Sequence, residues 1–190
     1  MAQQAHQIVS SESEELILVD ADDNEIGTLS KALSHDGDGV LHRAFSLFIF
    51  NTDGELLLQQ RSAGKRLWPM FWSNSCCSHP RRGETMDQAV ERRLAQELGL
   101  TCQLEYVYKF SYQARYGEAG SEHELCSVFL GRTDELPKVN DTEIAATRFL
   151  SAQGLAEALD SKPDEFTPWF KMEWERLNGE FAEKLERYTG

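Results

Sequence analysis

Residues 85–99 contain the start, the buried face and the end of a single amphipathic helix. Thr85 and Gln88 have the spacing of a capping box, in which each side chain hydrogen-bonds the backbone of the other residue. Gly99 supplies the glycine that helices favour directly after the last turn. The apolar residues between these ends recur every three or four positions: Met86, Ala89, Val90, Leu94 and Leu98. A helix with one apolar stripe has to bury it against a second layer, which excludes an all-β chain.

Segments typical of β-strands lie on both sides of this helix. A strand with one aromatic face is predicted by residues at every second position: Leu104, Tyr106, Tyr108, Phe110 and Tyr112. Short apolar runs predict further strands at 16–19, 45–50, 56–58, 122–130 and 145–150. Thr167 and Pro168 begin a helix whose apolar stripe runs to Tyr188. The pattern predicts an α+β fold: a mixed β-sheet core, flanking helices and a C-terminal amphipathic helix.

The sequence predicts one domain preceded by a short arm. Residues 1–15 are polar and acidic, and we expect them to form a flexible acidic N-terminal arm. Residues 16–190 contain neither repeats nor a linker that would divide them, and we expect a single domain there.

Composition excludes several classes of partner. The formal net charge is −13, which disfavours binding to nucleic acid. Apolar runs are far shorter than a membrane span, and the N-terminus lacks the basic start and apolar stretch of an export signal. The cysteines have no metal-finger spacing and form a poor disulfide framework: Cys76, Cys77, Cys102 and Cys126. We therefore expect a cytoplasmic protein with reduced thiols.

One segment reverses the sign of the charge. Between Arg61 and Arg93 there are seven basic and three acidic residues, so this segment carries +4 while the rest of the chain carries −17. Such a local reversal indicates a pocket for a small, multiply charged anion rather than for a polymer. The alternative is that some of these side chains are only solvated on a helix surface.

Three histidines and two glutamates are candidate metal ligands. His35, His42 and His79 lie near the ends of predicted strands, and Glu122 and Glu124 share one face of another. Two neighbouring carboxylates facing inward are costly unless a cation compensates them. Mixed nitrogen and oxygen donors suit manganese, magnesium, iron or zinc. The alternative is that each histidine is an ordinary loop residue.

The segment from Ser78 to Leu100 resembles the Nudix box, a loop–helix–loop whose glutamates hold metal against a diphosphate. The matching residues are Glu84, Arg92, Leu94, Glu97, Gly99 and Leu100. Ser78 replaces the first glycine of the box, and Arg93 and Gln96 replace two glutamates. Because hydrolysis by clustered magnesium needs several carboxylates, these replacements should disable it. The remaining Glu97 can hold a single Mg²⁺ on a substrate diphosphate.

Two further motifs flank this box in the order found in type 1 isopentenyl-diphosphate Δ-isomerases, a Nudix-like family. Residues 73–80 read SNSCCSHP and residues 122–126 read EHELC. The resemblance extends from about His35 to Trp169, with Ser78 departing from the family's usual glycine. It implies a Nudix-like fold and the interconversion of isopentenyl and dimethylallyl diphosphate by protonation and deprotonation of an alkene.

The resemblance also implies a role for individual residues. One divalent metal (Mn, Mg or Zn) would be held by His35, His42, His79, Glu122 and Glu124. The implied catalytic residues are Cys77, Glu124 and Tyr112. Glu97 would bind a second, diphosphate-bound Mg²⁺, and the implied substrate-binding residues are Arg61, Lys65, Arg93 and Trp169. We expect a small diphosphate substrate, no nucleic acid or membrane partner, and a monomer or weak homodimer.

The chemistry explains why such residues are needed. An unactivated alkene is a weak base, so its protonation requires a positioned acid on one face and a base on the other. A thiol and a metal-bound carboxylate can supply this pair. Two rival functions stay open at this point: a diphosphate hydrolase, and a binding module without catalysis.

Overall fold

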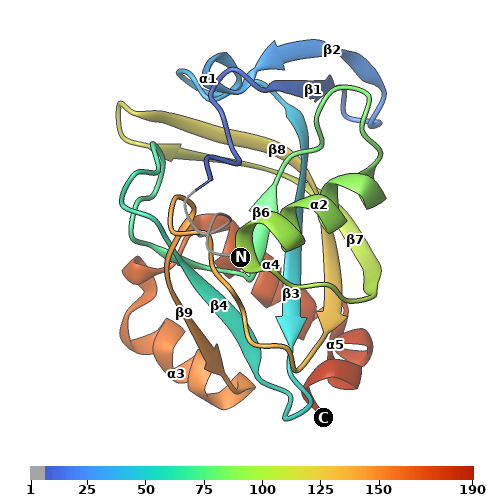
Figure 1. The fold of residues 1–190 in the computed structure, drawn as a ribbon, viewed down its shortest axis with the longest axis vertical. Coiled ribbons are helices and arrows are strands. Elements are labelled where there is room, and N and C mark those ends of the chain that lie inside the picture. The colour runs from blue at the N-terminus through green and yellow to red at the C-terminus, as the bar shows by residue number, and fades with distance from the viewer. Residues whose placement is uncertain (1–6) are drawn as a thin grey trace.

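The computed structural model describes residues 7–190 and shows a nine-stranded mixed sheet with helices on both faces (Figure 1). The strands are β1 (Glu15–Val19), β2 (Glu25–Ser30), β3 (His42–Phe50), β4 (Leu56–Arg61), β5 (Trp72–Ser73), β6 (Cys76–Ser78), β7 (Leu104–Tyr116), β8 (Gly120–Arg132) and β9 (Ile144–Leu150). The helices are α1 (Lys31–Ser34), α2 (Met86–Leu98), α3 (Ala152–Ser161), the 3₁₀ helix η1 (Pro163–Glu165), α4 (Pro168–Asn178) and α5 (Ala182–Thr189). The predicted α+β class is confirmed.

Strand β3 is the centre of the sheet. It pairs antiparallel with β1, β4 and β6, and it runs parallel to β8 along its whole length. Seven consecutive residues, 44–50, are buried, as expected for a strand covered on both faces. β3 therefore joins the elements that carry the histidines, the glutamates and the cysteine of interest.

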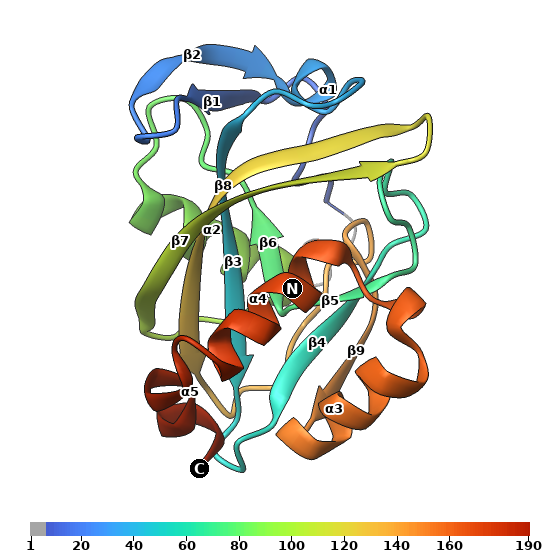
Figure 2. The same ribbon diagram turned by 180° about the vertical axis from the view of Figure 1, so that it is seen from behind.

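Helices cover the sheet from two sides. α2 packs on one face, and its capping box and left-handed Gly99 end it as the sequence predicts. α4 and α5 cross the opposite face (Figure 2), where their apolar residues join the larger of the two main cores. Residues of β6 contribute alternately to both cores, since successive side chains of a strand point to opposite faces.

The aromatic strand has two faces rather than the single one predicted. A register irregularity between Tyr106 and Tyr108 inserts Val107 into the pairing of β7 with β8. Such a bulge reverses the facing of the residues beyond it. Tyr106 stays 48% exposed, whereas Tyr108 and Tyr112 are buried in the core beneath α4. Tyr112 is the register partner of Glu124, so the two side chains share the face that the bulge turns toward the core.

The predicted long C-terminal helix is interrupted. α4 ends at Asn178 and α5 begins at Ala182, with Gly179 between them. Glycine has low helix propensity, and the chain turns here to keep both apolar stripes on the sheet. Trp174, in α4, and Leu185, in α5, still join one core.

The predicted arm, residues 1–15, lies partly outside the described residues, which begin at residue 7. Val9 is buried, and its backbone carbonyl accepts hydrogen bonds from Arg81 and Arg93. The division into an arm and a single domain stays a prediction. Within residues 7–190, no helix combines the length and apolar character needed to cross a membrane.

Candidate functional site

Five side chains from distant parts of the chain meet at one end of β3. His35 caps α1, His42 begins β3, and His79 directly follows β6. Glu122 and Glu124 lie two residues apart on β8, where Glu124 is the register partner of His42. One potential ligand atom from each residue lies within 4.8 Å of every other. The parallel pairing of β3 with β8 therefore brings His42 to the two glutamates, while the ends of α1 and β6 supply His35 and His79.

Backbone contacts fix two of the imidazole rings. Nδ1 of His35 lies 2.7 Å from the carbonyl oxygen of Lys31, and Nδ1 of His42 lies 2.7 Å from that of Val40. Since a carbonyl oxygen only accepts, each Nδ1 donates and each Nε2 is left to face the cluster. Gly120 permits this arrangement, because a Cβ at that position would come within 2.2 Å of the His35 carbonyl oxygen.

Burial controls the charge of the cluster. It lowers the pKa of His42 to about 3 and that of His79 well below its ordinary value, so both rings are neutral. Burial also raises the pKa of Glu124 to about 7, and the neighbouring carboxylate of Glu122 adds to the rise. Burial alone would lower the pKa of His35, but the adjacent carboxylate of Glu122 raises it to about 9, so this ring is a cation paired with Glu122. The carboxylates of the cluster therefore favour positive charge beside them.

The five residues fit a divalent metal ion. Nε2 of His42 is buried and has no hydrogen-bond partner among the described residues, which is costly for a polar atom. His35 Nε2 lies 2.8 Å from Glu122, and His79 Nε2 lies 2.9 Å from Glu124, so the donors already converge. Three nitrogens and two carboxylates exceed the four ligands of a structural zinc site. The donor set is compatible with several divalent metals.

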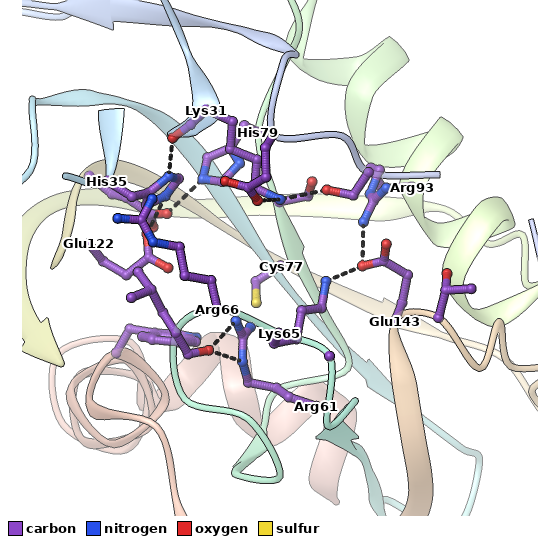
Figure 3. A pocket seen from close by; sticks show the side chains of 18 of the residues that line it. Lys31, His35, Arg61, Lys65, Arg66, Cys77, His79, Arg93, Glu122 and Glu143 are labelled. Atoms are coloured by element: carbon purple, nitrogen blue, oxygen red, sulfur yellow. Dashed lines mark hydrogen bonds and ion pairs between the residues drawn. The ribbon is translucent and has the colours of Figure 1, made fainter. Parts of the chain in front are cut away.

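Cys77 lies beside this cluster in a cavity of about 150 Å³. Cys77 and Cys76 are adjacent in β6 and face opposite ways: Cys76 is buried under α2, whereas Cys77 lines the cavity. In Figure 3 the sulfur of Cys77 stands between His35 and Glu122 on one side and Arg93 and Glu143 on the other. Burial raises the pKa of the Cys77 thiol to about 12, which keeps its proton in place.

Aromatic side chains border the same cavity. The Tyr112 hydroxyl donates to Glu124 over 2.6 Å. Trp169, in the first turn of α4, lies 6.3 Å from the Tyr112 ring and meets the Trp68 ring edge-on at 5.2 Å. The guanidinium of Arg61 lies over the Trp169 ring at 5.2 Å from its centre. The predicted catalytic and hydrocarbon-facing groups are therefore in one place.

Basic side chains line the other side of the cavity. Arg61 and Lys65, two of the predicted substrate-binding residues, lie there. Arg66 also lines the cavity, but on the side of His35 and Glu122 in Figure 3, where its guanidinium donates to Ala32, Asp36 and Ala119. Lys31 also lines the cavity and was not among the predicted site residues. The available signal was its position four residues before His35, one helical turn away. These cations surround a space suited to an anion with several negative charges.

Arg93 and Glu97 are neighbours, but only Arg93 lines the cavity. Arg93 lines the cavity and forms ion pairs with Glu97 and with Glu143, a residue that the sequence analysis also missed. Glu97 is buried beside Arg93 and is not part of the described lining. A role for Glu97 in binding a diphosphate-bound Mg²⁺ therefore stays a prediction.

Ser78, which departs from the family's usual glycine, is accommodated without strain. It is the last residue of β6 and pairs with Phe45. Its backbone is not in the left-handed region that would require glycine.

Comparison with known proteins identifies this architecture. A NUDIX domain matches residues 40–170. Solved structures agree on the fold: DR0079 from Deinococcus radiodurans has a TM-score of 0.67 and 21% identity, over 93% of this chain and 100% of that one. A MutT protein from Methanosarcina mazei Go1 has a TM-score of 0.60 and 20% identity, over 74% of this chain and 94% of that one. The chain is thus a NUDIX-domain protein.

Closer sequence relatives identify the family within that class. A Photorhabdus laumondii protein named isopentenyl-diphosphate Delta-isomerase 1 is 42% identical over 174 residues, which cover 90% of this chain and 99% of its own. A Burkholderia multivorans protein named isopentenyl-diphosphate Delta-isomerase is 43% identical over 163 residues, covering 86% and 92%. This chain belongs to the isopentenyl-diphosphate Δ-isomerase family.

Proposed function

We propose that the cavity interconverts isopentenyl and dimethylallyl diphosphate, with Cys77 and Glu124 serving opposite faces of the bound alkene. The observation that carries this proposal is the convergence of the three-histidine, two-glutamate cluster with a cavity-lining thiol and a group of cations. Membership of the isomerase family supports the same reaction.

The proton transfers require one group on each side of the alkene. Isomerisation adds a proton to one carbon and removes a proton from another, so one of the pair donates while the other accepts. In the reverse reaction the two groups exchange these roles. Tyr112 holds Glu124 in a fixed orientation through its hydrogen bond, which keeps the carboxyl aimed at the substrate.

A divalent ion in the cluster would be held by His35, His42, His79, Glu122 and Glu124, and it would supply positive charge that controls the protonation of Glu124. The backbone carbonyls of Lys31 and Val40 accept hydrogen bonds from His35 and His42 and so orient these two ligands before the ion binds. The face of Trp169 stabilises a positive charge developing on the hydrocarbon, worth on the order of 0.5–2 kcal/mol.

The cations bind the other end of the substrate. Arg61 and Lys65 border the cavity opposite the cluster and would contact the diphosphate, and Arg93 lines the cavity beside Glu143. We propose that Glu97 receives the Mg²⁺ that accompanies the diphosphate, since two other helical glutamates of the box are replaced by Arg93 and Gln96 while Glu97 is kept and lies next to Arg93. The hydrocarbon then points toward Cys77 and Trp169.

Product analysis tests the proposal. Incubation of the metal-loaded protein with isopentenyl diphosphate should give dimethylallyl diphosphate with no release of phosphate or pyrophosphate, measured by ³¹P and ¹H NMR. Release of either from this substrate or from a nucleotide would instead support the hydrolase alternative. Unchanged substrate would support a binding module.

Four further properties stay predictions. We propose Mn, Mg or Zn as the ion in the cluster. We also propose a cytoplasmic location and a monomer or weak homodimer, with no nucleic acid or membrane partner. Elemental analysis would test the identity of the ion, and light scattering would test the oligomeric state.

A further inference from the structure

Glu143 is a buried acid among the cations that line the cavity. Its side chain pairs with Lys65 and with Arg93, whose Nη2 lies 3.2 Å from Oε2 of Glu143 (Figure 3). Only 3% of its surface is exposed. A carboxylate repels the anion that such a site binds. Its presence there therefore calls for a structural explanation.

The backbone holds Glu143 rigidly. Ser62 bonds this segment twice: its amide donates to the carbonyl of Glu143 over 2.9 Å, and its hydroxyl donates to the carbonyl of Thr142 over 2.8 Å. The amide of Asn140 donates to the carbonyl of Glu97 over 2.8 Å. The segment before β9 is therefore fastened both to the Arg61–Lys65 loop and to the end of α2.

The two cations keep donors for another ligand. Lys65 has three N–H groups and uses one on Glu143. Nε of Arg93 is buried and has no hydrogen-bond partner among the described residues. An anion can therefore bind Lys65 without displacing Glu143, whereas Arg93, whose Nη1 and Nη2 donate to Val9, Glu97 and Glu143, contributes its charge.

The charges of the trio are mutually stabilising. Burial alone would raise the pKa of Glu143, but Lys65 and Arg93 lower it to about 2. Glu143 is thus an anion whenever the pocket binds substrate. A lysine has a flexible stem with many rotamers, and a fixed carboxylate selects one of them.

We propose that Glu143 is a positioning residue that holds Lys65 and Arg93 in the orientation that binds the substrate diphosphate. This inference rests on the proposed function. It assigns to Glu143 no contact with the reacting carbons, so its loss should weaken binding of the diphosphate and leave the chemical step nearly intact.

Titration of the metal-loaded protein with magnesium pyrophosphate tests this role without catalysis. For Glu143→Ala we expect binding weaker by about tenfold, a similar rise in KM for isopentenyl diphosphate, and kcat within about threefold of the parent value. Glu143→Gln keeps an acceptor oxygen without the charge, and we expect a smaller loss. Glu118→Ala, at an exposed site on the hairpin between β7 and β8, is the matched control and should bind normally.

A double-mutant cycle tests whether Glu143 acts through Lys65. In a Lys65→Ala background, Glu143→Ala should weaken pyrophosphate binding by less than about threefold, because the effects of coupled residues do not add. Fully multiplicative losses would overturn the proposal, as would pyrophosphate binding to Glu143→Ala that equals or exceeds that of the parent. If the alanine variant fails to fold by circular dichroism, Glu143→Gln decides: parent-like pyrophosphate affinity overturns the proposal. If the parent makes no dimethylallyl diphosphate, the proposed function fails while the titration still decides the role of Glu143.

Discussion

Replacement of Tyr112 by phenylalanine removes one hydrogen bond from the candidate catalytic carboxyl and little else. The Tyr112 hydroxyl donates to Oε2 of Glu124 over 2.6 Å, and both side chains are buried. Hydrogen bonds to charged groups contribute about 1.5–3 kcal/mol. If this contribution is realised in the transition state, kcat falls by about 10- to 150-fold. The phenyl ring keeps the contact with Trp169, so KM should change little.

The assay is the initial rate of dimethylallyl diphosphate formation, with metal content measured on the same samples. Tyr106→Phe is the matched control, because Tyr106 lies on the same strand but is largely exposed, and we expect it to be as active as the parent. A Tyr112→Phe protein with full metal and a rate within twofold of the parent would refute the role given to this hydrogen bond.

Other predictions concern the thiol, the metal and the stability of the core. Cys77→Ala should keep its fold and metal but lose about 10²–10⁴ in kcat, the usual contribution of a general acid or base; near-parent turnover would exclude the role. His79→Ala should lower the bound divalent metal measured by elemental analysis, and unchanged metal would reject this ligand set. Burial raises the pKa of Glu173 from 4.5 to about 8, so the folded protein retains a proton that the unfolded chain loses. The free energy of unfolding should therefore fall between pH 4.5 and 8, by at most about 1.4 kcal/mol per pH unit. Glu173→Gln should remove this contribution in urea titrations; an unchanged pH dependence would contradict it.

Sequence patterns correctly predicted those elements whose determining residues lie close together in the chain. The capping box at Thr85 and the glycine at position 99 correctly marked the ends of α2. Alternation along a strand correctly placed Glu122 and Glu124 on one face. These features depend on residues a few positions apart, where backbone geometry alone decides the outcome.

Features that depend on tertiary packing were harder to predict from the sequence. β2 was missed because Glu25–Ser30 is polar and only partly buried, so it has no strong alternation. The bulge at Val107 is a single residue, and the break between α4 and α5 spans only residues 179–181; each lets the neighbouring segments stay on the core. The hydrophobic periodicity of the sequence does not predict such a bulge or break.

The residues of the candidate site likewise divide into those that the sequence predicted and those that it did not. Resemblance to a known family indicated the metal cluster and Cys77, and the fold brings them together. Lys31 and Glu143 escaped because each reaches the cavity through contacts with distant segments. Glu143 also has the sign opposite to the one expected in an anion site, so charge counting directs attention away from it.

Conversion of isopentenyl diphosphate in heavy water tests the central claim most directly. With metal bound and the thiol and carboxyl each exchanging protons with solvent, NMR should show dimethylallyl diphosphate that carries deuterium on carbon. An allylic product free of deuterium, or release of pyrophosphate in its place, would contradict transfer of protons by a cysteine and a glutamate on opposite faces of the alkene.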